Sequence, residues 1–145
     1  MSHYCDSLLV TCEDFRLHQR KDGRNYLLDF IKQLKMDCDI ITRAGGIKDL
    51  IHYNKKEFRD SLERDIMVSL NLHNSHTIIL LNHEDCGAYS NFSFSSREEE
   101  LQQHYNDLKE AKKILSSQYP NKKIELYFAE LLPNTKDEFI IKKIN

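Results

Sequence analysis

The 145-residue sequence lacks any segment that suggests a membrane span, an export signal or a linker between domains. Its apolar runs are too short to cross a bilayer, and its N-terminus lacks the apolar core of a signal peptide. Glycine and proline are scarce, with four and two residues, and there is no internal repeat or low-complexity tract. We therefore expect residues 1–145 to form a single domain with its own hydrophobic core.

A strong excess of charge of one sign is also missing. The formal net charge of -2 at pH 7 offers no electrostatic basis for binding nucleic acid or an anionic membrane. Apolar residues make up 40% and charged residues 30% of the chain, which is typical of a globular protein. Four cysteines without an export signal indicate the reducing cytoplasm, where thiols more often act as ligands, nucleophiles or core residues than as disulfides.

Short apolar runs alternate with amphipathic segments along the chain. The pattern predicts strands at residues 7–11, 39–42, 77–81 and 124–128, and helices at residues 26–36, 58–72 and 98–115. The third strand is the strongest and is expected to be buried on both faces. The second helix has an apolar face that recurs every four residues, at Phe58, Leu62, Ile66 and Leu70. The alternation predicts an α/β fold with a mostly parallel, four- to five-stranded sheet flanked by helices.

The residues that can carry chemistry follow two of the predicted strands. Cys12, Asp14 and Arg16 come just after the first strand, and His83 and Cys86 come just after the third. Because sites in parallel α/β sheets lie outside the carboxyl ends of the strands, we expect these side chains to meet. Two thiolates and an imidazole are a full set of protein ligands for a zinc ion with one open position. The sequence therefore predicts a catalytic zinc site with a carboxylate and a guanidinium beside it.

Each motif alone has an ordinary explanation. A cysteine at a strand end is more often a small buried hydrophobic residue, and an Asp-x-Arg pair is usually a surface ion pair. Here both motifs follow predicted core strands, and an Ala-Gly-Gly turn at residues 44–46 lies between them in the sequence. This combination favours a metal site, whereas Cys5 and Cys38 lack such neighbours and are expected to be inert.

At these residues the chain resembles the β-class carbonic anhydrases. That family has C-x-D-x-R after its first strand, an A-G-G or A-G-N turn, and H-x-x-C-G after its third strand. The matching segments are residues 12–16, 44–46 and 83–87. The resemblance implies that Cys12, His83 and Cys86 bind Zn²⁺, and that a zinc-bound hydroxide reversibly hydrates carbon dioxide to bicarbonate. The chain would then be a zinc lyase.

The resemblance also implies roles for neighbouring residues. Asp14 would accept a hydrogen bond from zinc-bound water, or ligate zinc as a fourth ligand in a closed form. Arg16 would pair with Asp14 and hold it off the metal. Gly45 and Gly46 would let the backbone approach the site closely. In the family a neighbouring subunit completes the cleft, so we expect a homodimer or a higher homo-oligomer.

Two further positions bear on whether the site is catalytic. Gly87 is expected to relieve the backbone so that the ligands before it can converge on one ion. Phe15 stands where the family usually has Ser or Ala, and its ring could fill space that the substrate needs. Two alternatives to a carbonic anhydrase therefore remain open. One is a hydrolase of carbonyl sulfide or carbon disulfide on the same site, and the other is a non-catalytic protein that binds zinc for stability or senses bicarbonate.

Overall fold

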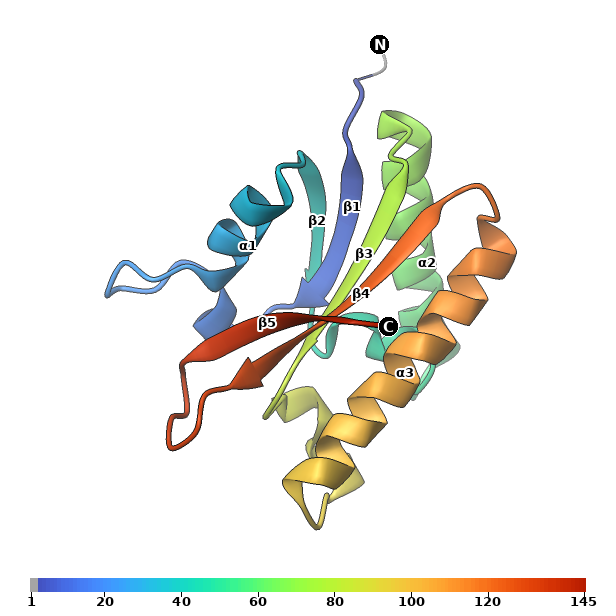
Figure 1. Ribbon diagram of the computed structural model, residues 1–145. Coiled ribbons are helices and arrows are strands. Elements are labelled where there is room, and N and C mark those ends of the chain that lie inside the picture. Colours follow the sequence, from blue (N-terminus) through green and yellow to red (C-terminus); the bar gives the residue numbers. More distant parts are fainter. Residues whose placement is uncertain (1–2) are drawn as a thin grey trace.

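The computed structural model describes residues 3–145, which form a five-stranded sheet with helices on both faces (Figure 1). The strands are β1 (Ser7–Cys12), β2 (Cys38–Arg43), β3 (Thr77–His83), β4 (Lys123–Leu131) and β5 (Phe139–Ile144). Their order in the sheet is β2-β1-β3-β4-β5. Strands β1 to β4 are parallel to one another, and β5 is antiparallel to β4. The predicted α/β class and mostly parallel sheet are confirmed.

Three α-helices connect the parallel strands in chain order. They are α1 (Tyr26–Leu34), α2 (Lys56–His73) and α3 (Arg97–Gln118). A helical crossover is the usual way to join parallel strands, because the chain must return to the same end of the sheet. In the part of the chain that the structure describes, no helix combines the length and the apolar character needed to cross a bilayer.

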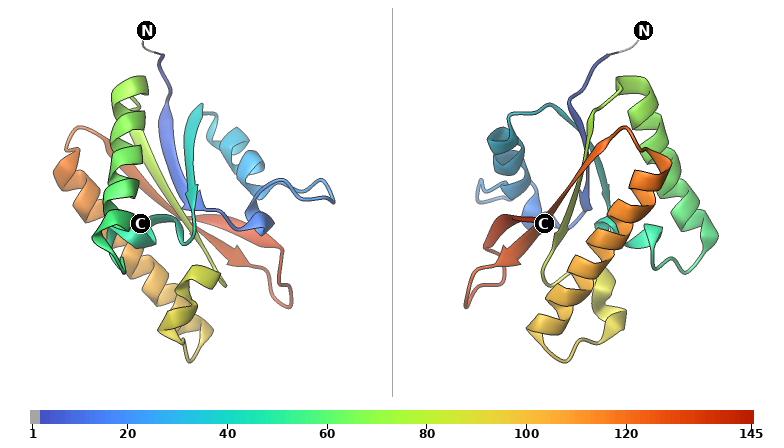
Figure 2. Two further views of the ribbon diagram at one scale, coloured as in Figure 1. Left: turned by 180° about the vertical axis from the view of Figure 1, so that it is seen from behind. Right: turned by 45° about the vertical axis from the view of Figure 1, so that its right-hand side comes forward.

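The sheet separates two hydrophobic cores. Helices α2 and α3 cover one face, and α1 covers the other (Figure 2). Successive strand residues point to opposite faces, so Leu8 belongs to the core beneath α2 and α3 while Leu9 belongs to the core beneath α1. All seven residues of β3 are buried, as expected for the central strand. The ligand motifs therefore follow the two most enclosed strands, β1 and β3.

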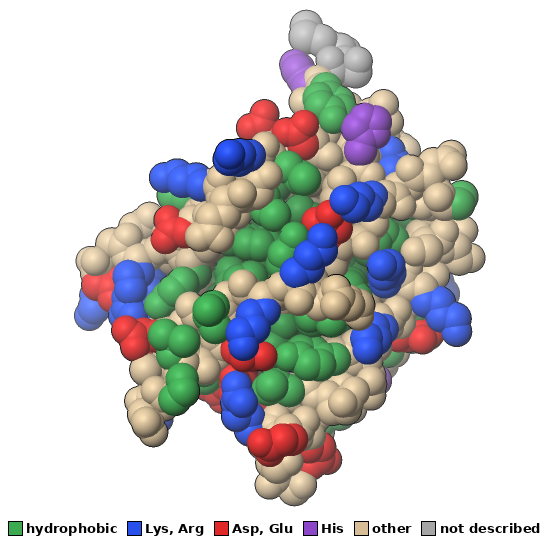
Figure 3. Space-filling view, viewed as in Figure 1, with side chains coloured by type: hydrophobic (Ala, Val, Ile, Leu, Met, Phe, Trp, Pro, Cys, Tyr) green, Lys and Arg blue, Asp and Glu red, His purple; other side chains and the backbone are tan. Residues whose placement is uncertain are grey.

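Helix α1 covers its face of the sheet less completely. It has nine residues, beginning after the side-chain cap of Asn25 and ending at Lys35 in the left-handed conformation. Apolar side chains beside it, among them Leu34, Tyr127 and Ile141, stay only partly buried. Figure 3 shows hydrophobic side chains on this side of the molecule with Lys and Arg around them. The core beneath α1 is consequently the smaller of the two.

One expectation about the elements needs correction. Phe58 was expected on the core face of α2, but it is 42% exposed, whereas Leu62 and Ile66 are fully buried. The helix begins at Lys56, so Phe58 lies in its first turn, before the turns that pack on the sheet. The fifth strand of the sheet, β5, lies at an edge, and among its residues only Phe139 is buried.

Candidate metal centre

Cys12, His83 and Cys86 come together at the carboxyl ends of two neighbouring strands. Cys12 ends β1 and His83 ends β3, and these strands pair in parallel register. Cys86 follows in the loop after β3. All three side chains are buried, and their donor atoms lie within 4.8 Å of one another. The predicted convergence of the two motifs is therefore present in the structure.

The orientation of His83 suits a metal ligand. Its Nδ1 lies 2.8 Å from the carbonyl oxygen of Glu84, which can only accept, so Nδ1 carries the proton. The other nitrogen, Nε2, is then an acceptor, and among the described residues it has no hydrogen-bond partner although it is buried. A buried, unpaired imidazole nitrogen beside two sulfurs is a donor set that fits a divalent metal such as zinc.

The two cysteines form a coupled pair. Their sulfur atoms lie 3.9 Å apart. The hydrogen bond from Cys86 and, next to it, the contact with His83 together lower the pKa of the Cys12 thiol to about 4, although burial acts in the opposite direction. The same hydrogen bond, together with burial, raises the pKa of Cys86. One thiolate is thus already favoured in this group of side chains, and thiolates are the form in which cysteine binds metals.

Asp14 and Arg16 form an ion pair next to these donors. The Arg16 Nη2 atom lies 2.8 Å and its Nε atom 3.0 Å from the Asp14 carboxylate, and the Arg16 backbone N–H donates to the same carboxylate at 2.9 Å. Burial would raise the pKa of Asp14, but these bonds from Arg16 outweigh it and hold the pKa below its usual range. Asp14 Oδ2 lies 3.8 Å from His83 Nε2, so the carboxylate borders the donor group.

Arg16 is itself fixed by other contacts. Its guanidinium donates to the Asp85 carboxylate at 3.0 Å, to the Asp85 carbonyl at 2.8 Å and to the Lys136 carbonyl at 2.8 Å. Its Cζ atom lies 5.5 Å from the centre of the Phe139 ring. Contacts from three segments thus determine where Arg16, and through it Asp14, is held.

The glycines near the site differ in what they do. Gly45 and Gly46 both have positive φ, at 79° and 58°, and a Cβ on Gly46 would lie 3.4 Å from the backbone nitrogen of Cys12. The turn therefore approaches the ligand strand closely, as expected. A Cβ on Gly87 would meet no atom of the described residues within 4 Å, and its φ is not positive. The left-handed residue of the ligand loop is instead Asp85, with φ of 58°.

Phe15 lies in the short 3-10 turn that follows Cys12 and is 70% exposed. It lines a surface hollow together with Gln19, Arg20, Lys21 and Asp22. The ring therefore points to the surface, whereas the ligand side chains are buried.

Helix α3 contributes to the site although the sequence pattern did not indicate it. Arg97 pairs with the buried carboxylate of Glu84, and Glu100 accepts from the Asp85 backbone N–H at 2.6 Å. One and two turns further on, α3 contributes His104 and Asp107. The available signal was a polar stripe with helical spacing.

His104 and Asp107 form a buried network behind the ligand loop. Asn82 Nδ2 lies 3.1 Å from His104 Nδ1, and the Tyr89 hydroxyl donates to Asp107 at 2.8 Å. Asp107 also lies 2.9 Å from Nε2 of the half-exposed His52. These bonds join the two ends of the ligand loop to one face of α3.

Comparison with known proteins agrees with this architecture. The fold is similar to that in the crystal structure of the β-carbonic anhydrase CafA of the fungal pathogen Aspergillus fumigatus, with a TM-score of 0.66 over 99% of this chain and 76% of that chain. The sequence identity of 12% limits this likeness to the fold.

The sequence itself gives a more direct assignment. Residues 3–138 match the family model described as "Putative carbonic anhydrase", and the chain belongs to this family. Two relatives are similar over 131 residues, or 86% of this chain. One is an uncharacterized protein of Rickettsia bellii (strain RML369-C), 30% identical with 76% of its length covered. The other is the uncharacterized protein RC0076 of Rickettsia conorii (strain ATCC VR-613 / Malish 7), 28% identical with 67% covered.

Proposed function

We propose that this protein is a zinc-dependent carbonic anhydrase, a lyase that reversibly hydrates carbon dioxide to bicarbonate. The observation that carries the proposal is the buried group of Cys12, His83 and Cys86, with all donor atoms within 4.8 Å of one another. The ion-paired carboxylate of Asp14 borders this group. The family and the β-carbonic anhydrase fold support the same activity.

In this proposal each residue has a defined task. Cys12, His83 and Cys86 would hold Zn²⁺ through two sulfur atoms and one ring nitrogen. Bound zinc supplies Lewis-acid activation, so that a water molecule loses its proton near neutral pH. Asp14 is ionised at that pH because its pKa is lowered, and it accepts a hydrogen bond that orients the nucleophile. Arg16 holds the Asp14 carboxylate in an ion pair, so that Asp14 would stay available to accept this hydrogen bond and would not act as a fourth ligand.

The exposure of Phe15 favours an enzyme over a non-catalytic zinc protein. The case for the non-catalytic alternative depends on a bulky ring in the substrate space. Within the single chain, a ring that is 70% exposed does not lie among the buried ligand side chains. Gly45 and Gly46 support the same conclusion, because they let the backbone border the site without adding side chains to it.

The first experiment measures metal content. We expect about one zinc ion per chain in the purified protein, and much less in Cys86→Ser, which loses one of three ligands. Cys5→Ser is the matched control, since Cys5 is also a reduced cysteine but lies outside the donor group. Equal zinc content in all three proteins would remove the metal site from the proposal.

The second experiment measures carbon dioxide hydration by stopped flow on zinc-loaded protein. We expect hydration above the buffer rate across about pH 6–9, the range in which zinc-activated water titrates. A rate equal to buffer throughout would overturn the proposed activity, and carbonyl sulfide and carbon disulfide would then be tested as substrates on the same sample. Hydrolysis of either would assign the site to the hydrolase alternative.

The third experiment tests the role of Asp14. Asp14→Ala should keep zinc and change the pH profile of hydration, because the carboxylate is lost while the ligands remain. Asp22→Ala is the control, since it removes a carboxylate that also pairs with an arginine, but on the surface. A pH profile unchanged in Asp14→Ala would count against this role.

We also propose that the chain forms a single cytoplasmic domain that assembles into a homodimer or larger homo-oligomer. The resemblance to β-class carbonic anhydrases supports the assembly, and the four reduced cysteines support the compartment. Sedimentation at micromolar concentration should give at least twice the monomer mass of 17.2 kDa. A monomer at all concentrations would contradict the assembly.

A further inference from the structure

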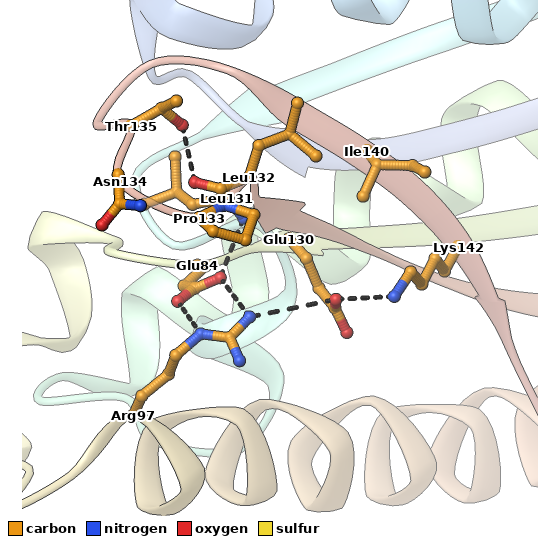
Figure 4. Close-up of a pocket in the computed structure, with 10 residues that line it drawn as sticks. All are labelled: Glu84, Arg97, Glu130, Leu131, Leu132, Pro133, Asn134, Thr135, Ile140 and Lys142. Atoms are coloured by element: carbon orange, nitrogen blue, oxygen red, sulfur yellow. Dashed lines mark hydrogen bonds and ion pairs between the residues drawn. The ribbon is translucent and has the colours of Figure 1, made fainter.

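Glu84 lies between the two ligands of the loop after β3, and its side chain is only 7% exposed. Its carboxylate accepts from Arg97 Nε at 2.6 Å, from Arg97 Nη2 at 3.2 Å and from the backbone N–H of Leu131 at 2.8 Å (Figure 4). The buried charge is therefore paired and hydrogen-bonded on both oxygens. Burying a charged carboxylate costs free energy even when it is paired. The position of Glu84 beside the proposed metal ligands therefore indicates a specific role.

The backbone of Glu84 touches the metal ligand itself. Its N–H donates to the Ala129 carbonyl at 2.9 Å, and its carbonyl accepts from His83 Nδ1 at 2.8 Å. The second bond keeps the proton on Nδ1 and leaves Nε2 free to bind a metal. Any rotation of the peptide after Glu84 would break this bond and release the ring of His83.

Local sequence does not determine the conformation of this loop. Asp85 has φ of 58°, which is unfavourable for a residue with a side chain. The first turns of α3 hold the loop from outside, because Arg97 binds the Glu84 carboxylate and Glu100 accepts from the Asp85 N–H. The loop shape thus depends on a helix that begins more than ten residues later in the chain.

We propose that Glu84 and Arg97 are positioning residues of the metal site. Their ion pair fixes the peptide whose carbonyl orients His83, and so sets the affinity of the site for its metal. This inference deepens the proposed function and rests on the metal site described there. It adds two residues that touch neither the metal donors nor the substrate with their side chains.

The test measures zinc affinity by competition with a chromophoric chelator, together with the visible absorption spectrum of the Co²⁺-loaded protein. Glu84→Ala and Arg97→Ala should each weaken zinc binding by about 10- to 100-fold, the usual effect of losing an outer contact to a ligand. Both should also alter the Co²⁺ spectrum, because His83 is less well oriented. Arg97 is half exposed, so Arg97→Ala keeps the inference testable if Glu84→Ala does not fold.

Glu130→Ala is the matched control. Glu130 lines the same surface hollow, pairs with Lys142 at 2.8 Å and lies 3.9 Å from Arg97 Nη2, but it belongs to β4 and not to the ligand loop (Figure 4). Glu130→Ala therefore removes the second, longer ion pair of Arg97 and leaves its bond to Glu84 in place. It should keep the wild-type affinity and spectrum. Wild-type zinc affinity in Arg97→Ala, or an equal loss in Glu130→Ala, would overturn the inference. Zinc binding by the unaltered protein without carbon dioxide hydration would refute only the proposed activity.

Discussion

Replacing Gly46 by alanine perturbs the backbone of the candidate metal site without changing any of the proposed ligand side chains. Gly46 has φ of 58°, and a Cβ there would lie 3.1 Å from Asn82 Oδ1, 3.3 Å from the carbonyl carbon of Thr11 and 3.4 Å from the nitrogen of Cys12. Two of these neighbours are backbone atoms of β1, which is paired on both sides and cannot move aside easily. The substitution therefore adds steric strain to conformational strain.

The expected cost has two parts. The left-handed conformation costs a residue with a Cβ about 1–2 kcal/mol, and crowding in a tightly packed region adds about 1–3 kcal/mol. Gly46→Ala should thus lower the free energy of unfolding by about 3 kcal/mol, which corresponds to roughly 10 °C in Tm for a domain of this size. Because β1 must shift at Cys12, zinc affinity should fall as well.

Two other glycines supply the controls. Gly23 has φ of 88°, but a Cβ there would meet no described atom within 4 Å, so Gly23→Ala should show the conformational part alone, about 1–2 kcal/mol. Gly87 has neither a positive φ nor a described atom within 4 Å of an added Cβ. Gly87→Ala should therefore change the free energy of unfolding by no more than about 0.5 kcal/mol. Urea unfolding followed by circular dichroism measures all three. Equal losses in Gly46→Ala and Gly23→Ala would refute the argument from close approach.

Three further predictions concern the scaffold, and urea unfolding measures each. Leu62→Ala should lower the free energy of unfolding by about 2–5 kcal/mol because Leu62 is fully buried. Phe58→Ala should lower it by less because Phe58 is 42% exposed. A larger loss in Phe58→Ala would contradict the orientation of α2. The hydrogen bond from Lys123 holds the pKa of Glu125 below its usual range despite burial. The ionised carboxylate therefore stabilises the fold when the pH is above the ordinary pKa of Glu. This stabilisation is lost as the pH falls through the lowered pKa. Glu125→Gln should therefore be less stable than wild type at pH 7 but not at about pH 2, and a constant difference would refute the assignment. Ser96→Ala removes the side-chain cap of α3 and should cost about 1 kcal/mol, with no change expected if the cap is not formed.

The convergence of the candidate metal ligands could be predicted because its signal is local. Cys12 and His83 each end an apolar run, and parallel strands place their carboxyl ends at one edge of the sheet. The Asp14–Arg16 ion pair could be placed beside them for the same reason, because both residues come just after Cys12. The role expected of Gly87 could not be predicted correctly. The left-handed residue of the loop is Asp85, and contacts from α3 stabilise that conformation.

The helices and strands likewise could be predicted where the sequence carries a local apolar pattern. Strands β1 to β4 and all three helices have periodic apolar patterns of ordinary length, and the structure contains each of them near the expected residues. The range of β5 was not predicted, because its apolar run covers only Phe139, Ile140 and Ile141 and two lysines follow it, as suits an edge strand that buries little. The exposure of Phe58 was missed because helical spacing does not tell which turn of a helix meets the sheet.

The sequence by itself determined the α/β class, the mostly parallel sheet and the convergence of Cys12, His83 and Cys86, because all of these depend on short-range patterns and on the geometry of parallel strands. Only the tertiary structure decided how the site is held. The anchoring of Glu84 by Arg97, the contacts of Arg16 with Asp85 and the exposure of Phe15 join segments that are distant in the chain or depend on solvent access. No local pattern encodes such contacts, since they exist only once the helices have packed on the sheet.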